Sequence, residues 1–474
     1  MERAQDIHST SQPLVSKQIP RVDCIKGRVN LQNLHANHPL RYPYLLESSA
    51  QSDTTRYSIL FAYPAESLQL NANGQLVFNN KTVSDSNDFL GYLDHKWQQY
   101  QQQYQSDVTL PFSGGWFLFL GYELAQQIEP RLNLPMPEDG FPVACAVRIP
   151  AAIIYDHATD ETYIVVEGDK RELLDNIKRD IKKTDNTETI ANNDLELKIN
   201  LSEEEPERYI HNVAKVKRYI IDGDVFQVNL SRRWSSDRPT DLTPYQVYQQ
   251  LLQSNPAPFS GIMQFPFGSI ISSSPERLLS IRNGIASTRP IAGTRPRSKD
   301  IVDDKAFKDE LIAHPKERAE HIMLIDLERN DLGRVCKPGS IEVDELMVLE
   351  SYAHVHHIVS NVKGMLRTGV KPGEAIRAVF PGGTITGCPK ERCMAIIAEL
   401  EKEARGAYTG SVGYLNHNGD MDLNILIRTI TMTGNEIRFR AGAGLVFDSI
   451  AEKELEETRH KAKGMLLALG CTDA

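Results

Sequence analysis

The 474-residue sequence has no long apolar run, no basic cluster and few cysteines. No apolar stretch approaches the roughly 20 residues of a membrane helix, and the N-terminus lacks the apolar segment of a secretory signal. A net charge of −10 without basic runs argues against nucleic-acid binding. Six cysteines without a paired framework indicate a reducing compartment. We therefore expect a cytoplasmic protein that binds neither membranes nor nucleic acids.

The remaining composition is that of a globular protein, with 41% hydrophobic and 24% charged residues. Residues 183–207 are rich in Asp, Asn, Thr and Glu and read as a solvated connection. We expect an N-terminal unit over 1–190 and a catalytic domain over 207–467. Strands alternate with helices in both, which favours an α+β fold.

Several segments carry clear secondary-structure signals. The all-apolar run 114–122 predicts a buried strand, and 144–155 with 162–166 predicts a hairpin. A strand pair is expected over 261–282. Near the C-terminus we expect strands over 410–415, 423–431 and 436–441, joined at the turn signals Asn418-Gly419 and Gly434-Asn435.

Two predicted helices, around 314–331 and 453–461, each carry a pair of glutamates three residues apart. Glu317 and Glu320 share one face of the first helix, and Glu454 and Glu457 share one face of the second. Four carboxylates from two helices suit a hard cation such as Mg²⁺. The spacing alone is a very weak metal signal and favours two solvated acidic helix faces.

Other polar segments leave their roles open. The loop 380–390 has the first glycine spacing of a phosphate-binding loop, but Cys-Pro-Lys replaces the required Gly-Lys-Ser/Thr, so we exclude nucleotide binding. His354 and His356 fall on one strand face and His357 on the other, which favours a packed or substrate-facing histidine over a zinc site. Glu276 is either a lone general acid or part of a capped turn.

Taken together, the motifs resemble those of the chorismate-utilising enzymes, in that family's order. The likeness covers residues from about 207 to about 465 strongly and the N-terminal part more loosely. It rests on Gln227-Val-Asn-Leu-Ser-Arg, Ser273-Ser-Pro-Glu-Arg, Pro290-Ile-Ala-Gly-Thr-Arg-Pro-Arg, 319–334, 380–390 and Gly442-Ala-Gly444. The resemblance implies a large two-layer α/β sandwich of the anthranilate synthase/aminodeoxychorismate synthase type, with antiparallel sheets and helices packed outside.

The resemblance also implies roles for individual residues. Mg²⁺ would bind the ring carboxylate of chorismate, with Glu320 and Glu457 as direct ligands and Glu317 and Glu454 acting through water. Glu276 would protonate the departing 4-hydroxyl, and we expect its pKa to be raised by burial and nearby carboxylates. His357 and Thr384 would line the ring. The substrate carboxylates would be held by Gly293, Thr294, Tyr408, Arg428, Gly442, Gly444 and Lys461.

Members of the family differ in their nucleophile. Gln227 stands where water-using members carry a lysine base, which favours ammonia. Ala292 stands where many aminodeoxychorismate synthases carry a nucleophilic lysine, and matches anthranilate synthases instead. Asn229 and the segments 380–383, 420–429 and 114–123 look like component I of aminodeoxychorismate synthase. We favour amination at C4, with anthranilate synthase component I as the alternative and an inactive scaffold as a third.

Two further expectations concern partners. The chain has no Gly-x-Cys-x-Gly elbow, so we expect ammonia from a separate glutamine amidotransferase subunit. A second group of residues resembles the tryptophan pocket of these enzymes, as a regulatory site or a structural remnant: Leu46, Glu47, Ser48, Arg56, Tyr57 and Pro256.

Overall fold

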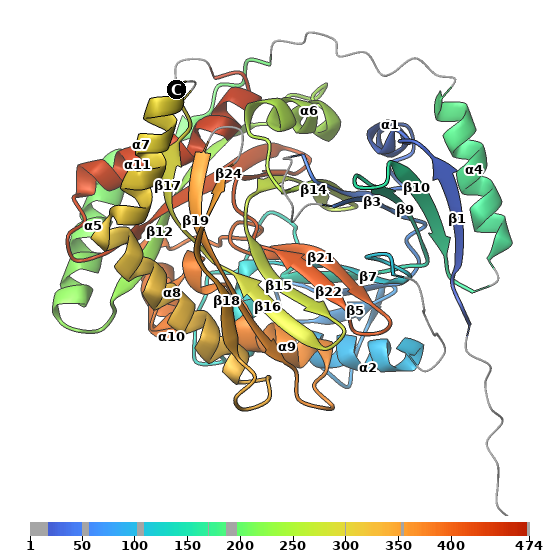
Figure 1. The fold of residues 1–474 in the computed structure, drawn as a ribbon, viewed down its shortest axis with the longest axis horizontal. Coiled ribbons are helices and arrows are strands. Elements are labelled where there is room, and N and C mark those ends of the chain that lie inside the picture. Colours follow the sequence, from blue (N-terminus) through green and yellow to red (C-terminus); the bar gives the residue numbers. More distant parts are fainter. Residues whose placement is uncertain are drawn as a thin grey trace, which may run out of the picture.

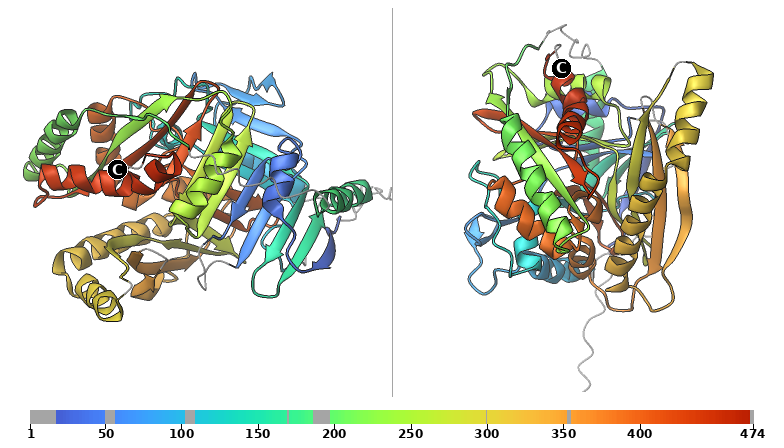
Figure 2. Two further views of the ribbon diagram at one scale, coloured as in Figure 1. Left: turned by 90° about the horizontal axis from the view of Figure 1, so that it is seen from above. Right: turned by 90° about the vertical axis from the view of Figure 1, so that its left-hand side faces the viewer.

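Two large antiparallel sheets form the centre of the molecule in the computed structural model (Figure 1). It describes residues 18–49, 56–101, 109–168, 170–185, 197–298, 300–351 and 355–471. Within these ranges each sheet contains 12 strands. Helices cover the outer faces, as the two rotated views show (Figure 2). The expected α+β sandwich with outer helices is confirmed.

The first sheet joins strands from both ends of the chain. Its order is β1 (Arg21–Lys26), β10 (Glu161–Val166), β9 (Ala151–Asp156), β3 (Tyr57–Ala62), β2 (Tyr44–Glu47), β13 (Phe259–Phe265), β14 (Gly268–Ser274), β23 (Thr429–Met432), β24 (Glu436–Leu445), β12 (Gln227–Asp237) and β11 (Ser202–Glu203), with β20 (Gly387–Cys388) also paired to β12.

The second sheet likewise joins strands from both parts of the chain. Its order is β17 (Ile291–Pro296), β19 (Val355–Met365), β16 (Ile285–Arg289), β15 (Arg277–Arg282), β22 (Met421–Asn424), β21 (Ser411–Asn416), β7 (Gly115–Leu120), β8 (Ala144–Ile149), β4 (Ser67–Leu70), β5 (Leu76–Phe78) and β6 (Lys81–Thr82), with β18 (Glu342–Ser351) paired to β19. Segments 1–190 and 207–467 therefore share both sheets.

Helices pack on the two outer faces and around the end of β12. The first sheet is covered by α1 (Leu31–Asn37), α4 (Arg171–Asp185), α6 (Pro244–Ser254) and α11 (Ala451–Ala468). The second is covered by α2 (Phe89–Gln101), α8 (Pro315–Gly333) and α9 (Pro372–Val379). Around β12 lie α5 (Pro206–Ile221) and α10 (Lys390–Glu401). The remaining helical segments are η1 (Tyr122–Leu124), α3 (Ala125–Ile128), α7 (Ile301–Ala313) and η2 (Gly383–Ile385).

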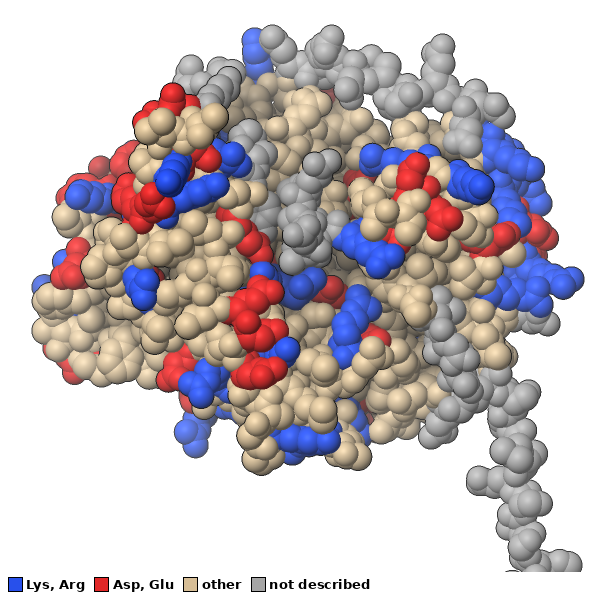
Figure 3. All heavy atoms as spheres, viewed as in Figure 1, with Lys and Arg blue, Asp and Glu red and all other residues tan. Residues whose placement is uncertain are grey.

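The surface carries charges of both signs. Over the face in Figure 3, acidic and basic side chains alternate, and Lys and Arg gather on α4. No helix of the described residues is long and apolar enough to cross a membrane.

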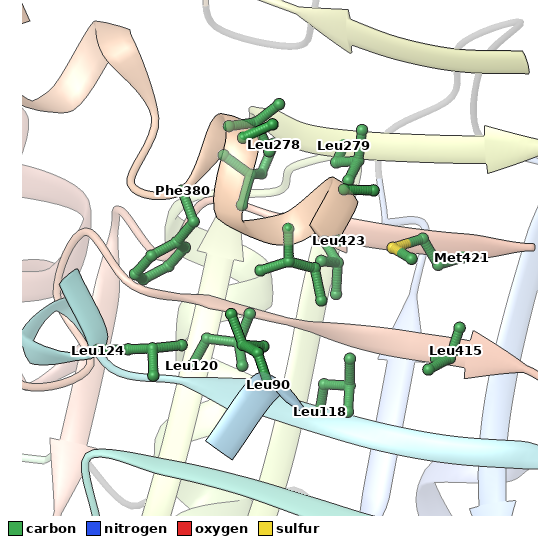
Figure 4. Packing of buried hydrophobic residues seen from close by; sticks show 14 of the residues in the cluster. Leu90, Leu118, Leu120, Leu124, Leu278, Leu279, Phe380, Leu415, Met421 and Leu423 are labelled. Atoms are coloured by element: carbon green, nitrogen blue, oxygen red, sulfur yellow. The ribbon is translucent and has the colours of Figure 1, made fainter. Parts of the chain in front are cut away.

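The outer face of the second sheet packs against α2 and α9 through branched aliphatic side chains. Leu90 of α2 meets Leu118 and Leu120 of β7, with Leu415 and Leu423 from the neighbouring strands beside them (Figure 4). Strand β7 is buried along its whole length, as its unbroken apolar sequence predicts. Its other face turns toward the first sheet.

Between the sheets, aromatic rings fill one part of the interior. Tyr44 of the first sheet stacks on Phe117 of the second, with ring centroids 4.2 Å apart and planes at 7°. Phe61 meets Phe117 edge-on at 5.2 Å. These contacts hold the layers together by dispersion and by burial of large apolar area.

The chain passes from one sheet to the other in the middle of runs that the sequence presents as single strands or strand pairs. Residues 144–155 form β8 and β9 in different sheets, because Pro150 cannot continue a hydrogen-bonded ladder. Residues 423–431 likewise form β22 and β23, and 261–282 include a crossing between β14 and β15. The single-strand predictions at 144–155 and 423–431 are therefore wrong. Two of the crossings carry Glu276 and Arg428.

Candidate active site

Glu276 is a buried carboxyl in the crossing between β14 and β15. Its side chain is 4% exposed, and its Oε1 lies 3.4 Å from the Ile291 N–H. Burial raises its pKa to about 7, while Arg428 and Lys461 oppose that rise. The raised pKa agrees with our expectation, but burial is its main cause and the charges beside it are cations. A carboxyl with this pKa can hold a proton for donation near neutral pH.

Arg428 lies in the other crossing, between β22 and β23. Its backbone has φ of +53°, a left-handed conformation that is strained for a side chain of this size, and its carbonyl accepts from the Ser273 N–H at 3.1 Å. Desolvation lowers the pKa of the guanidinium, and Tyr408, Glu457 and Glu276 oppose that. The strained turn thus holds a desolvated guanidinium beside Glu276.

Lys461 of α11 adds a second cation. Its Nζ lies 2.6 Å from Glu457 Oε1 and donates to the Gly442 carbonyl at 3.0 Å. Arg428 and Lys461 both act on Glu276, so these residues from two crossings and one helix form a single site. Its positive groups suit a substrate that carries carboxylates.

Two glycines of β24 keep this site open. A Cβ at Gly442 would lie 2.7 Å from the Leu230 carbonyl oxygen and 2.8 Å from the Tyr408 hydroxyl. A Cβ at Gly444 would lie 2.5 Å from Gln227 Nε2. The backbone therefore comes close to the polar groups of β12, as a ligand-binding strand requires.

Gln227 and Asn229 of β12 face this strand. They lie two residues apart, so their side chains share one face. The Gln227 Oε1 and Asn229 Oδ1 atoms are both buried and accept no hydrogen bond from any described residue. Buried polar atoms normally have partners, so this pair marks a place for a donor that the chain itself does not supply.

Thr384 and His357 are contributed by two different elements, η2 and β19. Thr384 lies in η2, and its buried hydroxyl lies beside the Glu276 carboxyl, where it lowers that group's pKa. It makes no hydrogen bond of good geometry within the described residues. His357 of β19 is buried, with Nδ1 3.5 Å from the Gly293 carbonyl oxygen, and burial lowers its pKa to about 4. His357 is therefore neutral at physiological pH.

Ala292 and Gly293 lie on β17, next to His357. Ala292 is 9% exposed and pairs with Ile358, so no nucleophile stands at this position. Gly293 has φ of +68°, and a Cβ there would lie 2.9 Å from Glu317 Oε2. The Thr294 backbone pairs with His357, and its side chain lies outside the described part.

The four helix glutamates lie on two helices, Glu317 and Glu320 on α8 and Glu454 and Glu457 on α11. Glu454 is buried, whereas Glu457 is 48% exposed and held by Lys461. Glu317 lies on the first turn of α8, with Oε1 3.4 Å from Arg295 Nη1, and Glu320 is half-buried on the same helix. In the described residues no three His, Cys, Asp or Glu side chains form a ready metal cluster. Carboxylate oxygens are the donors that Mg²⁺ prefers, so these four glutamates are the residues that would hold such a cation.

The two other histidines of the predicted cluster differ in what the structure describes of them. His354 lies outside the described residues, and the buried His356 contacts Asp304 at 2.9 Å and Ser351 at 2.8 Å. All six cysteines are free.

Arg405 is a residue that the sequence did not single out. It is buried and pairs with Glu401, the last residue of α10. Its guanidinium donates to the carbonyls of Asn229 at 2.8 Å and Ile385 at 3.1 Å, and lies over the Tyr408 ring at 5.5 Å. Arg405 therefore positions the Asn229 backbone, the Ile385 backbone and the Tyr408 ring around the site. The i, i+4 spacing of Glu401 and Arg405 was its only sequence signal.

A separate cavity of about 330 Å³ lies near the N-terminal strands. Five of the six predicted pocket residues line it, namely Leu46, Glu47, Ser48, Arg56 and Tyr57. Pro256 does not line it. The lining proline of that segment is Pro258, followed by Phe259.

The chain is similar in sequence and fold to known proteins. The family model for chorismate binding enzymes matches residues 42–467. An anthranilate synthase component I-like protein of Synechocystis sp. is 43% identical, over 76% of this chain and 73% of that protein. Aminodeoxychorismate synthase component 1 of Bacillus subtilis is 41% identical, over 79% and 81%. The crystal structure of anthranilate synthase component I from Streptococcus pneumoniae superposes with a TM-score of 0.78 at 33% identity, over 88% and 93%.

Proposed function

The chain belongs to the family of chorismate binding enzymes and acts on chorismate, and from that premise we propose that it is component I of an aminodeoxychorismate synthase. In this reaction ammonia replaces the 4-hydroxyl of chorismate and gives 4-amino-4-deoxychorismate, a precursor of 4-aminobenzoate and folate. The observation that carries the choice of an amine nucleophile is the pair of unpartnered amide oxygens on Gln227 and Asn229.

The amide pair favours ammonia over activated water as the nucleophile. Neither amide can remove a proton from water, because a neutral amide is not a base. Both oxygens can accept N–H hydrogen bonds, which would hold neutral ammonia and direct its lone pair toward the ring. They lie against Gly442 and Gly444, where the backbone leaves room for the substrate.

The other side chains divide the work on the substrate. Arg428, Lys461 and Tyr408 would bind the carboxylates, and the N–H groups of β24 would add to them. Glu276 would donate its proton to the departing hydroxyl, which then leaves as water. His357, being neutral, would pack against the ring without adding charge.

Mg²⁺ is part of this proposal. Glu320 and Glu457 would hold the cation, with Glu317 and Glu454 supporting it through water. When bound, the cation would neutralise the ring carboxylate of the substrate. A Glu320→Gln variant should lose most turnover and require more Mg²⁺, whereas Glu452→Gln, an exposed neighbour on α11, should match the unaltered chain. Equal turnover in both variants would support an inactive scaffold instead.

Ala292 favours a second candidate, anthranilate synthase component I, which aminates C2 and releases pyruvate. The names of the relatives include both activities. Incubation with chorismate, Mg²⁺ and an ammonium salt at alkaline pH separates the two. Fluorescent anthranilate formed without any added lyase would contradict C4 amination. A product that yields 4-aminobenzoate only after a lyase is added is the result we expect.

We further propose that a separate glutamine amidotransferase subunit delivers the ammonia. Without it, glutamine should not replace ammonium salts in the same assay.

The cavity beside Arg56 and Tyr57 is proposed to bind tryptophan. Aromatic and aliphatic lining with Glu47 and several arginines suits an amphoteric aromatic ligand. Tryptophan should raise the melting temperature, and Leu46→Trp, which enlarges a half-buried side chain that lines the cavity, should abolish that rise.

A further inference from the structure

A second buried carboxyl lies behind the site. Glu328 of α8 is 6% exposed, and none of the roles above uses it. The titratable groups around it are Asp331 of the same helix, Lys390 of α10 and Glu276 of the β14–β15 crossing. Buried carboxyls are costly unless they are neutral, paired or functional.

Glu328 and Glu276 flank the same two segments of backbone. Glu276 lies against the Ile291 N–H and Thr384. Glu328 lies against Thr288, three residues before Ile291, and its Oε1 would be 3.3 Å from a Cβ at Gly383, the residue before Thr384. The charge of Glu276 also acts on Glu328 and contributes to the raised pKa of that carboxyl.

Two further charged residues, Asp331 and Lys390, lie between Glu328 and the protein surface. Asp331, one helical turn further along α8, is paired with Lys390, whose Nζ also donates to the Val379 carbonyl at 3.0 Å. Asp331 and Lys390 line a cavity of about 260 Å³ at the protein surface, together with Asn330 and Cys388. Acidic groups thus run from Glu276 through Glu328 to Asp331, which lines the surface cavity.

In the proposed reaction Glu276 needs a route by which it can be protonated again. Each turnover transfers its proton to the departing hydroxyl oxygen, so the carboxylate must recover one proton before the next turnover. Its own side chain is 4% exposed, and a bound substrate with its two carboxylates would cover the open side. Direct exchange with bulk water would then be slow.

We propose that Glu328 returns a proton to Glu276 after each turnover and is itself recharged from solvent through Asp331 and Lys390. The step forms an O–H bond on Glu276 and breaks one on Glu328, and water at the surface cavity supplies the replacement proton to Glu328 by way of Asp331 and Lys390. This inference rests on the proposed function of Glu276.

The acidities of the two carboxyls fit this transfer. Burial raises the pKa of Glu276 and of Glu328 to about 7 each. Proton transfer between groups of similar pKa is nearly balanced in free energy, so neither carboxyl traps the proton.

The test compares Glu328→Gln, which has the same shape but no exchangeable acid, with Asp326→Asn, an exposed side chain on the same helix. Under single turnover, with enzyme in excess, Glu328→Gln should react at the unaltered rate because Glu276 starts protonated. In steady state its rate should fall about tenfold or more, and small weak acids such as formic acid should restore it. Asp326→Asn should behave like the unaltered chain in both assays.

A steady-state rate equal to that of the unaltered chain would overturn the relay, as would an equal fall in both assays without rescue by weak acid. If Glu328→Gln does not fold, Asp331→Asn at the outer end of the route decides by the same two outcomes. If the unaltered chain and Asp326→Asn give no aminated product from chorismate, the proposed function fails instead.

Discussion

At the scale of single residues, the burial of Glu276 favours activity and lowers stability. The carboxyl is useful for proton donation because burial keeps it protonated near neutral pH. The same burial makes its ionised form unfavourable in the folded protein. Activity and stability should therefore respond in opposite directions when this carboxyl is replaced.

Glu276→Gln should lower kcat by about 10²–10⁴-fold, the usual contribution of a general acid. In the unaltered chain, kcat/KM at a fixed concentration of free ammonia should fall as pH rises through about 7, as Glu276 loses its proton. The measurement is a pH–rate profile for both proteins. A profile of the unaltered chain that stays flat through pH 7 would rule out Glu276 as the acid.

Glu276→Gln should be more stable than the unaltered chain at alkaline pH. The pKa of Glu276 rises from 4.5 when exposed to about 7 when folded, so the folded state binds more protons in between. The stabilising contribution of Glu276 is complete below a pH of about 4.5 and is lost as the pH rises through about 7. At pH 8 the unaltered chain bears a penalty of about 3 kcal/mol.

Urea unfolding at pH 5 and pH 8 measures this effect. Glu276→Gln should gain free energy of unfolding over the unaltered chain at pH 8 and gain little at pH 5. An equal difference at both pH values would contradict the linkage.

At the scale of secondary-structure elements, strand β24 is shaped by its glycines. Gly442→Ala places a methyl group against the Leu230 carbonyl, Tyr408 and Asn229, so KM for chorismate should rise by about tenfold or more while the fold persists. Gly434→Ala, in the turn before the same strand, meets no atom within 4 Å and should change nothing. Steady-state kinetics with circular dichroism of both variants checks this, and equal KM values would argue against a substrate site on β24.

Local sequence signals predicted many of these elements. Helix α5 ends before Gly223, whose φ is +82°, as glycine at a helix end predicts. Asn418-Gly419 and Gly434-Asn435 form the expected hairpins. The crossings between sheets were missed, because an apolar run is buried on both sides of the crossing and its periodicity does not change there.

The site was predictable only in part, for a related reason. Glu276 and Arg428 are 152 residues apart in the sequence, and the two crossings bring them together. Family resemblance linked them, whereas residue spacing could not. Arg405 and Glu328 act from behind the site, through carbonyls and a second carboxyl, and such contacts leave no pattern along the chain.

At the scale of the whole molecule, the two sequence segments form one folding unit. Strand β2 pairs with β13 and β7 pairs with β21, so each segment alone exposes long unpaired edges. Residues 1–190 and 191–474 expressed separately should be insoluble or unfold without cooperativity, and co-expression should restore activity. Urea unfolding followed by circular dichroism checks this, and a cooperative transition in isolated 1–190 would show an independent domain.

The pairing of β7 with β21 also has a consequence during synthesis of the chain. β7 ends at Leu120 and β21 begins at Ser411, so the ribosome must add about 290 residues before the pairing strand exists. At about 5–20 residues per second this takes roughly 15–60 s. Throughout that time one edge of the apolar strand Gly-Trp-Phe-Leu-Phe-Leu lacks its final neighbour. The nascent polypeptide should therefore depend on chaperones far more than the finished enzyme does.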